Sequence, residues 1–569
     1  MHKLKSIEQL RGLNETSLRY FSSISVTIFA IALWIYSILN AKLIIGFYGF
    51  IHSLPVFFFI SLILLTFASA LLWNLDKNCE NILFLQLCLL ISELWLTPIL
   101  LGASHPGRLW TYHLLSSFVD SILSHGFIKP ETLWYHNWPG SWIFYAIIYL
   151  ILGLNFPSHE LILIYPFLFQ FAIMLPLYSL LRNIIEEPNS RWIAMWLIYL
   201  ANWIGQDNIL AQSFAYLLFL MIILSLTILR KYEFKRTSQS FLTILLFATL
   251  VISHLLTSIV TYFIFLVLYI MKKLRRHTLV TISVIIIAWT IYGSYYQFNL
   301  HFPAFLEKAF KIDIIFEKMI FKRITETSAP HSAVNIIRSF TALLFVIISL
   351  LGFLKEVTAR KKWPINKNDM FVIWMLEGIF ITLVLVGPSY GFETPQRIYI
   401  FSLIPIGFFG KKLLNSKATR IVMLIFLIIA LPLHVISHYG NQIIDYASPG
   451  YLAGSFFFSE KSHGGSVLAS YGSIIPFSFS FYERHDYFLL DNLYEEERVE
   501  GKKNLSISEF LKVKNQINPL YVCISDYDKK FYYYEYNDTT FAEKSDDFLQ
   551  KSKSFNFIYN NGITHLYFY

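Results

Sequence analysis

The stretch from Gly102 to Gly140 reads GASHPGRLWTYHLLSSFVDSILSHGFIKPETLWYHNWPG and separates two hydrophobic runs that can each enter a membrane. It is long and polar, and it contains four histidines and three tryptophans. In a chain that is otherwise mostly apolar, this loop is where water-facing chemistry can be placed.

Composition fixes the broad class of the protein. Of the 569 residues, 56% are hydrophobic and 15% are charged, and the mean hydropathy is +0.53. A soluble globular fold cannot bury that much apolar surface. Runs near the length of a membrane helix, about 20 residues, recur at 18–40, 52–73, 82–101, 160–181, 209–229, 277–299, 334–354, 369–387 and 419–437, and shorter runs lie at 138–153, 191–204, 240–253, 255–271 and 396–411. The sequence predicts an α-helical polytopic membrane protein with about 13 or 14 transmembrane helices.

Lysines and arginines cluster in four short loops: RKYEFKR (230–236), KKLRR (272–276), ARKKWPINK (359–367) and KKLLNSKATR (411–420). Cytoplasmic loops of membrane proteins carry such an excess, so these four loops are predicted to be cytoplasmic. This pattern also accounts for the net charge of +9, and we expect no nucleic-acid partner.

The order of the runs contains a conflict about the first long loop. Counting spans from a cytoplasmic N-terminus places 102–140 outside, whereas counting backward from RKYEFKR places it inside. One run therefore does not cross fully. The candidates are the short run 138–153 and the broken pair 191–204 and 209–229, and we expect the loop to be external.

The chain changes character near residue 440. Long apolar runs stop, and residues 441–569 carry short segments predicted as strands: GSVLAS (465–470), PLYVCIS (519–525), KFYYYEY (530–536) and THLYFY (564–569), with a helix at 505–516. We expect residues 1–440 to form the transmembrane domain and residues 441–569 an external α/β or α+β domain. Two N-glycosylation acceptor patterns, at Asn504 and Asn537, agree with that location.

The external loop holds the largest set of candidate site residues. A helix from about Leu109 to Ser124 would place Tyr112, Ser116 and Asp120 near one face, with His113 beside it. The alternative is an interfacial helix anchored by tryptophan and tyrosine. The polar candidates in the loop are His105, Arg108, Tyr112, His113, Asp120, His125, Glu131, Tyr135 and His136.

Two short polar segments add further candidates. SHLLTS (253–258) separates two apolar runs and would bring His254 to the outer water boundary, although a simple polar turn explains it as well. In GPSYGFETPQRIYIF (387–401), Glu393 precedes a helix start, where the helix dipole stabilises a carboxylate. Arg397 would lie one turn deeper, at headgroup level, where it can hold a phosphate or simply anchor the helix.

Two carboxylates lie within predicted membrane runs, Glu93 and Glu377. Charges at such depth are functional or paired, unless they lie near a helix end and reach water.

The order of these segments resembles a known group of proteins. A span is followed by an external loop that ends in YHNWPG, then by DNILAQSFAYLLF (207–219), SHLLTS, YGFETPQRIYIF and a final FNFIYNNGITHLYFY. This resembles the archaeal multi-spanning membrane proteins of the GT-C glycosyltransferase superfamily, relatives of oligosaccharyltransferases and polyprenyl-phosphate-sugar-dependent mannosyltransferases. The resemblance covers most of the chain from about residue 85 and consists of loose patterns in a set order.

The resemblance implies transfer of a sugar from a polyprenyl (dolichyl) phosphate carrier to a cell-surface glycan, lipid or protein acceptor at the external face of the cell membrane. In the family, an acidic residue early in the first external loop serves as general base or metal ligand. Arg108 and Leu109 stand where that carboxylate is expected, so Asp120 has taken its place or the chain is a non-catalytic scaffold.

The chemistry assigns roles to the candidates. Asp120 or His113 would act as the base, and Arg108 and Arg397 would stabilise the departing phosphate. Tyr112, His136, His254 and Glu393 complete the predicted substrate-binding set. A divalent metal, Mg or Mn, is compatible with this chemistry but not required by it, since the loop has no DxD or ExD pair. The alternative from another class is a transporter or lipid-carrier flippase, in which Glu93 and Glu377 would mark a pathway.

Overall fold

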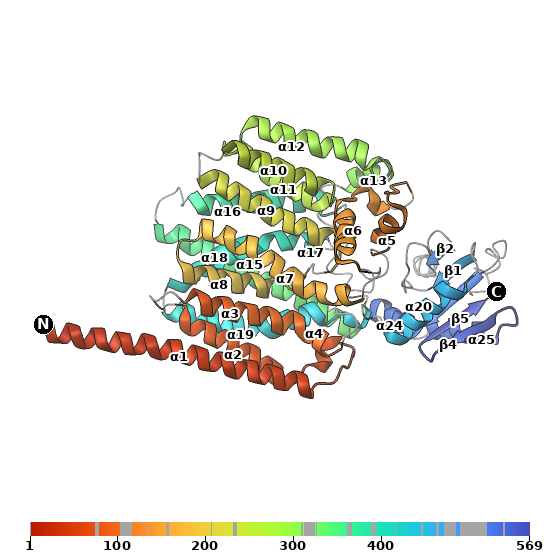
Figure 1. Ribbon diagram of the computed structural model, residues 1–569, viewed down its shortest axis with the longest axis horizontal. Helices are drawn as coiled ribbons and strands as arrows, with labels where there is room; N and C mark the ends of the chain where they lie inside the picture. The colour runs from red at the N-terminus through yellow and green to blue at the C-terminus, as the bar shows by residue number, and fades with distance from the viewer. Residues whose placement is uncertain are drawn as a thin grey trace.

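The computed structural model describes residues 2–73, 75, 79–102, 116–131, 134–154, 159–205, 208–231, 236–308, 311, 325, 327–360, 367–388, 394–415, 417–444, 446, 448–462, 466–470, 485–489, 520–538 and 541–568. Each of the fourteen hydrophobic runs predicted from the sequence lies on a helix or on consecutive helical segments. Figure 1 shows the long helices side by side, with a small sheet beyond one end and the N-terminus beyond the other.

The helical part of the chain contains helices of very different length. They are α1 (His2–Asn40), α2 (Val56–Leu72), α3 (Glu80–Ile91), α4 (Thr97–Leu100), α5 (Ser116–His125), α6 (Gly140–Leu152), α7 (His159–Ile184), α8 (Pro188–Ala201), α9 (Ala211–Lys231), α10 (Arg236–Val251), α11 (Leu255–Ile270), α12 (Arg276–Ala288), α13 (Tyr295–Lys308), α15 (Ala329–Arg360), α16 (Lys367–Val386), α17 (Thr394–Tyr399), α18 (Leu403–Gly410) and α19 (Lys417–Tyr439). Short 3-10 or π segments join some of them: η1 (Phe50–Ser53), η2 (Ser92–Leu96), η4 (Trp134–Asn137), η6 (Trp289–Gly293), η8 (Ile400–Ser402), η9 (Lys411–Asn415) and η10 (Gln442–Ile444).

Eight helical segments in the described part of the chain are long and apolar enough to cross a membrane. They are Thr16–Asn40, Glu80–Leu100, Leu161–Ile184, Ala211–Leu229, Arg276–Gly293, Ala329–Thr358, Lys367–Val386 and Ala418–Ile444. Four shorter apolar helices accompany them, Val56–Leu72, Gly140–Leu152, Ser238–Val251 and Leu255–Ile270. The protein is therefore a multi-pass membrane protein.

Two of the predicted spans are buried inside the bundle. Every residue from Trp192 to Ala201 in α8 is buried, and so is every residue of α18. Gly407 on α18 lies so close to α8 that a Cβ atom there would be 2.7 Å from the Ala194 carbonyl oxygen. Small residues permit this approach of two helix backbones, which is how helices in a membrane gain packing energy.

Specific contacts define two ends of the bundle. At one end, Lys412 (η9) pairs with Glu356 (α15) at 3.6 Å, and Asn368 (α16) donates to the Ile184 carbonyl of α7 at 3.0 Å. The described helix ends beside the four basic loops lie on this side, where Asn183 of α7 donates to Thr227 of α9 and Lys273 lies over the Trp374 ring of α16. At the opposite end, the Gly140 amide of α6 donates to the Ile252 carbonyl at 2.9 Å. Positive charge thus concentrates at one end of the bundle, as the positive-inside pattern predicts.

Helix α6 explains why counting spans from the N-terminus and counting backward from RKYEFKR place the loop 102–140 on different sides. Its 13 residues rise about 20 Å, and the 14 residues of α8 rise scarcely more, so the direction of α6 and not its length distinguishes it. Figure 1 draws α6 across the direction of the long helices, at the end that carries α5 and α13. Setting α6 aside leaves thirteen of the fourteen runs, and this odd number places the N-terminus and the sheet at opposite ends of the bundle.

The C-terminal sheet has five strands in the order β2-β1-β3-β5-β4. The strands are β1 (Ser466–Ser470), β2 (His485–Leu489), β3 (Leu520–Ser525), β4 (Asn556–Asn560) and β5 (Thr564–Phe568), and the helices around them are α20 (Pro449–Lys461), α24 (Asp526–Tyr536) and α25 (Phe541–Lys551). β1 pairs in parallel with β2 and β3, whereas β5 pairs antiparallel with β3 and β4. We keep residue 440 as the proposed domain boundary.

Helix α24 joins the sheet to the bundle. The Tyr534 hydroxyl donates to the Gly440 carbonyl at 3.2 Å, and the Tyr534 ring stacks on His331 of α15 with centroids 4.6 Å apart. The Ser328 amide donates to the Tyr534 carbonyl at 3.1 Å. These contacts hold the sheet at the end opposite to the basic loops.

The strand predicted for KFYYYEY is wrong, because residues 530–536 belong to α24. Ser525 and Asp528 form a capping box that starts a helix just before this segment. Tyr527, Phe531 and Tyr534 then recur at helical spacing, and the alternation of aromatic residues is incidental. The strands predicted at 465–470, 519–525 and 564–569 are confirmed as β1, β3 and β5. The helix predicted at 505–516 lies outside the described residues.

Candidate functional site

Four elements meet at the end of the bundle that faces the sheet. The Ser141 hydroxyl of α6 donates to the Ala211 carbonyl at the start of α9, at 3.2 Å. The same hydroxyl lies 3.4 Å from the Ser253 carbonyl in the turn between α10 and α11. Gln212, one residue into α9, donates from Nε2 to the Arg397 carbonyl of α17 at 3.3 Å. Residues far apart in the sequence are therefore brought to one place.

His254 caps the N-terminus of α11 in this place. Its Nδ1 accepts from the Thr257 amide at 3.3 Å and lies 2.9 Å from the Thr257 hydroxyl, and the side chain is buried. Burial lowers the pKa of His254, and the charge of Arg397 lowers it further. The imidazole is thus neutral with its proton on Nε2, because Nδ1 accepts. Such a ring can donate to an anion without carrying a charge of its own.

Arg397 lies on α17, partly buried, close enough for its charge to act on His254. The structure therefore brings together two of the residues predicted for the site, His254 and Arg397. Sequence reasoning placed both at the outer boundary, and the hydrogen bond from Gln212 to the Arg397 carbonyl joins α17 to the start of α9. Glu393 lies outside the described residues.

The described part of the loop 102–140 packs at the same end of the bundle. The indole Nε1 of Trp289 donates to the Asn137 carbonyl at 3.1 Å and fixes the end of the loop to η6. Phe118, Tyr135 and Trp142 pack in a ring cluster with centroids 5.2–5.6 Å apart. This apolar cluster attaches α5 to α6.

His136 is buried within this loop and both of its ring nitrogens are engaged. Nδ1 accepts from the Lys129 amide at 2.9 Å, and Nε2 lies 3.1 Å from the Phe118 carbonyl, to which it donates. Burial lowers the pKa of His136. Both ring nitrogens of His136 are thus engaged within the loop, and its substrate-binding role stays a prediction.

Asp120 lies on α5 and is partly exposed, and the Ser124 hydroxyl donates to its carboxylate at 3.3 Å. α5 packs on α6, whose N-terminus contacts the turn that carries His254. Asp120 therefore lies on α5, next to the helix α6 that contacts the turn with His254. The remaining loop candidates, His105, Arg108, Tyr112 and His113, lie outside the described residues, and so does the first part of the helix predicted from Leu109.

Sequence reasoning did not single out four residues at this end of the bundle. They are Gln212, Tyr399, Trp203 and Arg338. Arg338 is buried on α15, donates from Nε to the Ser437 carbonyl at 2.7 Å, and lies 5.6 Å above the Trp203 ring. A signal was present for Arg338, because it is a charged residue within the apolar run 334–354. The other three gave none, because tyrosine and tryptophan are ordinary at membrane boundaries.

A metal site requires a cluster of ligand side chains. Within the part of the chain that the structure describes, no group of three His, Cys, Asp or Glu side chains is arranged to hold a metal ion. No step proposed below depends on a metal.

Comparisons with known proteins gave matches among solved structures only. No family model matches the chain, and no curated protein matches it. The chain is similar to ArnT from Cupriavidus metallidurans bound to undecaprenyl phosphate, with 12% identity, a TM-score of 0.48, and coverage of 86% of this chain and 97% of that one. The apo state of the same protein gives 11% identity and a TM-score of 0.46 over the same shares.

The GT-C-like architecture stays an expectation from the sequence, because a TM-score below 0.5 carries no argument about the superfamily. At this identity and TM-score the similarity carries no information about substrate or site residues, and the archaeal affinity stays a prediction.

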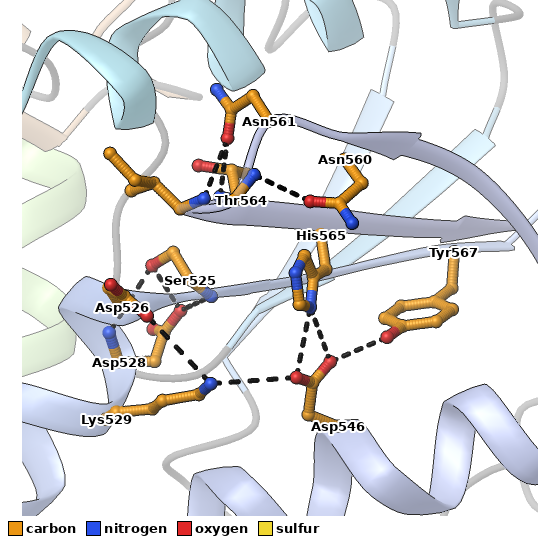
Figure 2. Close-up of polar contacts among 12 residues, drawn as sticks. Ser525, Asp526, Asp528, Lys529, Asp546, Asn560, Asn561, Thr564, His565 and Tyr567 are labelled. Atoms are coloured by element: carbon orange, nitrogen blue, oxygen red, sulfur yellow. Dashed lines mark hydrogen bonds and ion pairs between the residues drawn. The ribbon is translucent and has the colours of Figure 1, made fainter.

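A second polar cluster lies in the C-terminal domain, around Asp546 of α25 (Figure 2). His565 Nδ1 donates to both carboxylate oxygens at 3.0 Å, and the Tyr567 hydroxyl donates at 2.6 Å. Lys529 lies 3.7 Å away. Burial, together with the carboxylate, raises the pKa of the Tyr567 phenol. The cluster attaches α25 to β5 and to α24, which is a structural role.

We predict that Asp546→Asn loosens this end of the domain. The amide cannot accept from three donors at once, and charge-assisted hydrogen bonds contribute about 1.5–3 kcal/mol each. Amide hydrogen exchange in 541–568 should rise clearly in the full chain. The control is Asp547→Asn, whose side chain is 60% exposed and pairs only with the exposed Lys551; such pairs contribute little. Equal exchange in the two variants would contradict the assignment.

Proposed function

We propose that this protein transfers a sugar from a polyprenyl-phosphate-linked donor to an acceptor at the outer face of the membrane. The donor carrier is of the dolichyl phosphate class, and the acceptor is a cell-surface glycan, lipid or protein. The proposal places residues 441–569 and the loop 102–140 outside the cytoplasm, because both connect to the end opposite to the basic loops.

The observation that carries the proposal is the meeting of Arg397 with a neutral, buried His254 at that end. A polyprenyl phosphate holds its anion at headgroup depth, with its tail among the lipids. A guanidinium fork matches two phosphate oxygens, and burying it at this depth is costly unless it is used. The Nε2 proton of His254 adds a donor without the cost of a second buried charge.

The reaction follows from these groups. The acceptor hydroxyl oxygen attacks the anomeric carbon of the donor sugar and passes its proton to Asp120 or, alternatively, His113. The bond between the anomeric carbon and the phosphate oxygen breaks with both electrons on the oxygen. The polyprenyl phosphate leaves with additional negative charge, which Arg397 and His254 stabilise.

A transporter or lipid-carrier flippase is the second candidate, and one observation favours it. Glu93 is fully buried in the π-helical segment η2, and in the described structure neither carboxylate oxygen has a hydrogen-bond partner. π-Helical turns inside helices are frequent at functional sites, and intramembrane carboxylates mark transport pathways. The flippase would move the carrier lipid without breaking the sugar–phosphate bond.

The location of the C-terminal domain can be tested by labelling. A single cysteine at Asn537, an exposed position, in a background without Cys79, Cys88 and Cys523 should react with a membrane-impermeant maleimide in intact cells. A cysteine at Lys272, at the basic end, should react only after the membrane is opened. Protection of position 537 in intact cells would place the domain inside.

Arg397→Lys should weaken binding of the carrier although it keeps the charge. Loss of the bidentate contact removes roughly one charge-assisted hydrogen bond, so the dissociation constant for dolichyl phosphate should rise about tenfold. The matched control is Arg420→Lys, whose Nε donates to the Leu414 carbonyl at the basic end. If the two variants bind the carrier equally, Arg397 is not part of the phosphate site.

Asp120→Asn should abolish most transfer while carrier binding persists. The amide keeps the shape of the side chain and cannot take the proton, and loss of a general base reduces the rate about 10²–10⁴-fold. Transfer of labelled sugar in liposomes measures this, with Ser124→Ala as the control that removes only the hydrogen-bond donor to Asp120. An Asp120→Asn variant at the parent rate would leave His113 as the base. A parent that transfers nothing across a panel of donors would favour the scaffold or the flippase.

A further inference from the structure

A cavity of about 550 Å³ with an apolar lining lies between α10, α12 and η6. The end of α10 contributes Ala248 and Ile252, and α12 with η6 contributes Ala288, Trp289 and Tyr292. Its volume falls within the range of ligand sites, about 300–1,000 Å³. Ala288 and Tyr292 are also exposed, so the cavity reaches the surface of a candidate membrane span, Arg276–Gly293.

This cavity lies at the end of the bundle that carries the proposed phosphate site. The Ile252 carbonyl accepts from the Gly140 amide at 2.9 Å, and His254 follows Ile252 by two residues. The Trp289 indole lines the cavity and also donates from Nε1 to the Asn137 carbonyl at 3.1 Å. The cavity is therefore next to the turn with His254, at membrane depth.

Small residues and a π-helical turn shape the wall. A Cβ atom at Gly293 would lie 2.5 Å from Cδ2 of Trp289, so the glycine permits the position of the indole. The π-helical segment η6 interrupts the α-helix at this point, and such turns are frequent at functional sites. Alanines at 248 and 288 leave room for a hydrocarbon chain that carries methyl branches.

The hydrophobic effect does not by itself choose the occupant, because bilayer lipid is as apolar as the wall. The choice depends on shape and on what is attached to the chain. A carrier whose phosphate binds at Arg397 and His254 holds the start of its chain beside Ile252. Attachment raises the effective concentration of that chain at the cavity above that of a free lipid.

We propose that this cavity binds the first isoprene units of the carrier lipid and selects a methyl-branched chain over a straight one. This inference rests on the proposed function and assigns chain selectivity to Ala248 and Ala288. The occupant is the isoprenoid chain of the same molecule whose phosphate is held at Arg397.

The test compares two lipid phosphates that differ only in their methyl branches, phytanyl phosphate and hexadecyl phosphate. Binding is measured on the purified full-length protein in lipid nanodiscs. Ala288→Phe fills the cavity from an exposed position, so the fold should tolerate it. The control is Val280→Phe on the same helix, about two turns toward the basic end, at a position that is 52% exposed and does not line the cavity.

The parent should bind phytanyl phosphate about 3–10-fold more tightly than hexadecyl phosphate, because the branches gain van der Waals contacts with the wall. Ala288→Phe should remove this preference, mainly by weakening phytanyl phosphate, whereas Val280→Phe should keep it. A phytanyl phosphate with a diazirine on its first isoprene unit should label residues 285–293 in the parent and in Val280→Phe, but not in Ala288→Phe.

Other outcomes overturn the inference. Equal binding of the two phosphates by the parent would mean that ordinary acyl chains fill the cavity. A preference that persists in Ala288→Phe, or labelling confined to other segments, would place the chain elsewhere. Arg397→Lys separates the two proposals, since it should weaken both phosphates equally; if it does so while the parent shows no preference, the proposed function stands and the chain site fails. A parent that binds neither phosphate removes both.

Discussion

A backbone that crosses hydrocarbon has no water to bond with, so its amides and carbonyls must pair within the segment, and only helices and closed barrels do this. Every long apolar run of this protein accordingly becomes helix, and the described strands all lie beyond residue 465. The same constraint drives polar groups to the ends of the bundle. Basic residues collect at one end, and His254 and Arg397 meet at the other.

The end that carries the proposed site is built from interrupted helices. α6 runs across the direction of the long helices, and the Gly140 amide at its N-terminus donates to the Ile252 carbonyl before α11. The short segment η8 separates α17 from α18. Helix α8 ends before Trp203, and the next helix, α9, begins at Ala211. Helix ends offer unpaired backbone groups and chain reversals. Such irregular backbone is stable at membrane depth only where protein covers it or where it lines a cavity.

Much of the fold could be predicted from the sequence, because hydrophobic run length is a direct consequence of bilayer thickness. His254 and Arg397 were also recognisable, since each interrupts or begins an apolar run. KFYYYEY was misread because aromatic alternation imitates a strand, whereas the capping box at Ser525 and Asp528 decides the helix. Trp203, Tyr399 and Gln212 gave no signal, since each residue type is common near membrane boundaries and only its unsatisfied polar atom sets it apart.

The sequence by itself determined the membrane class, the positions of the helical runs and the concentration of basic loops, and it predicted His254 and Arg397 as site residues. These follow from local composition, which acts over the length of one helix. The tertiary structure alone decided that α6 runs across the long helices, that both ring nitrogens of His136 bond within the loop, that Gln212 bonds to the Arg397 carbonyl and that Trp203 lies beside Tyr399. The contacts of Gln212 and Trp203 join segments more than a hundred residues apart, and close packing is a property of complementary surfaces that no single segment contains.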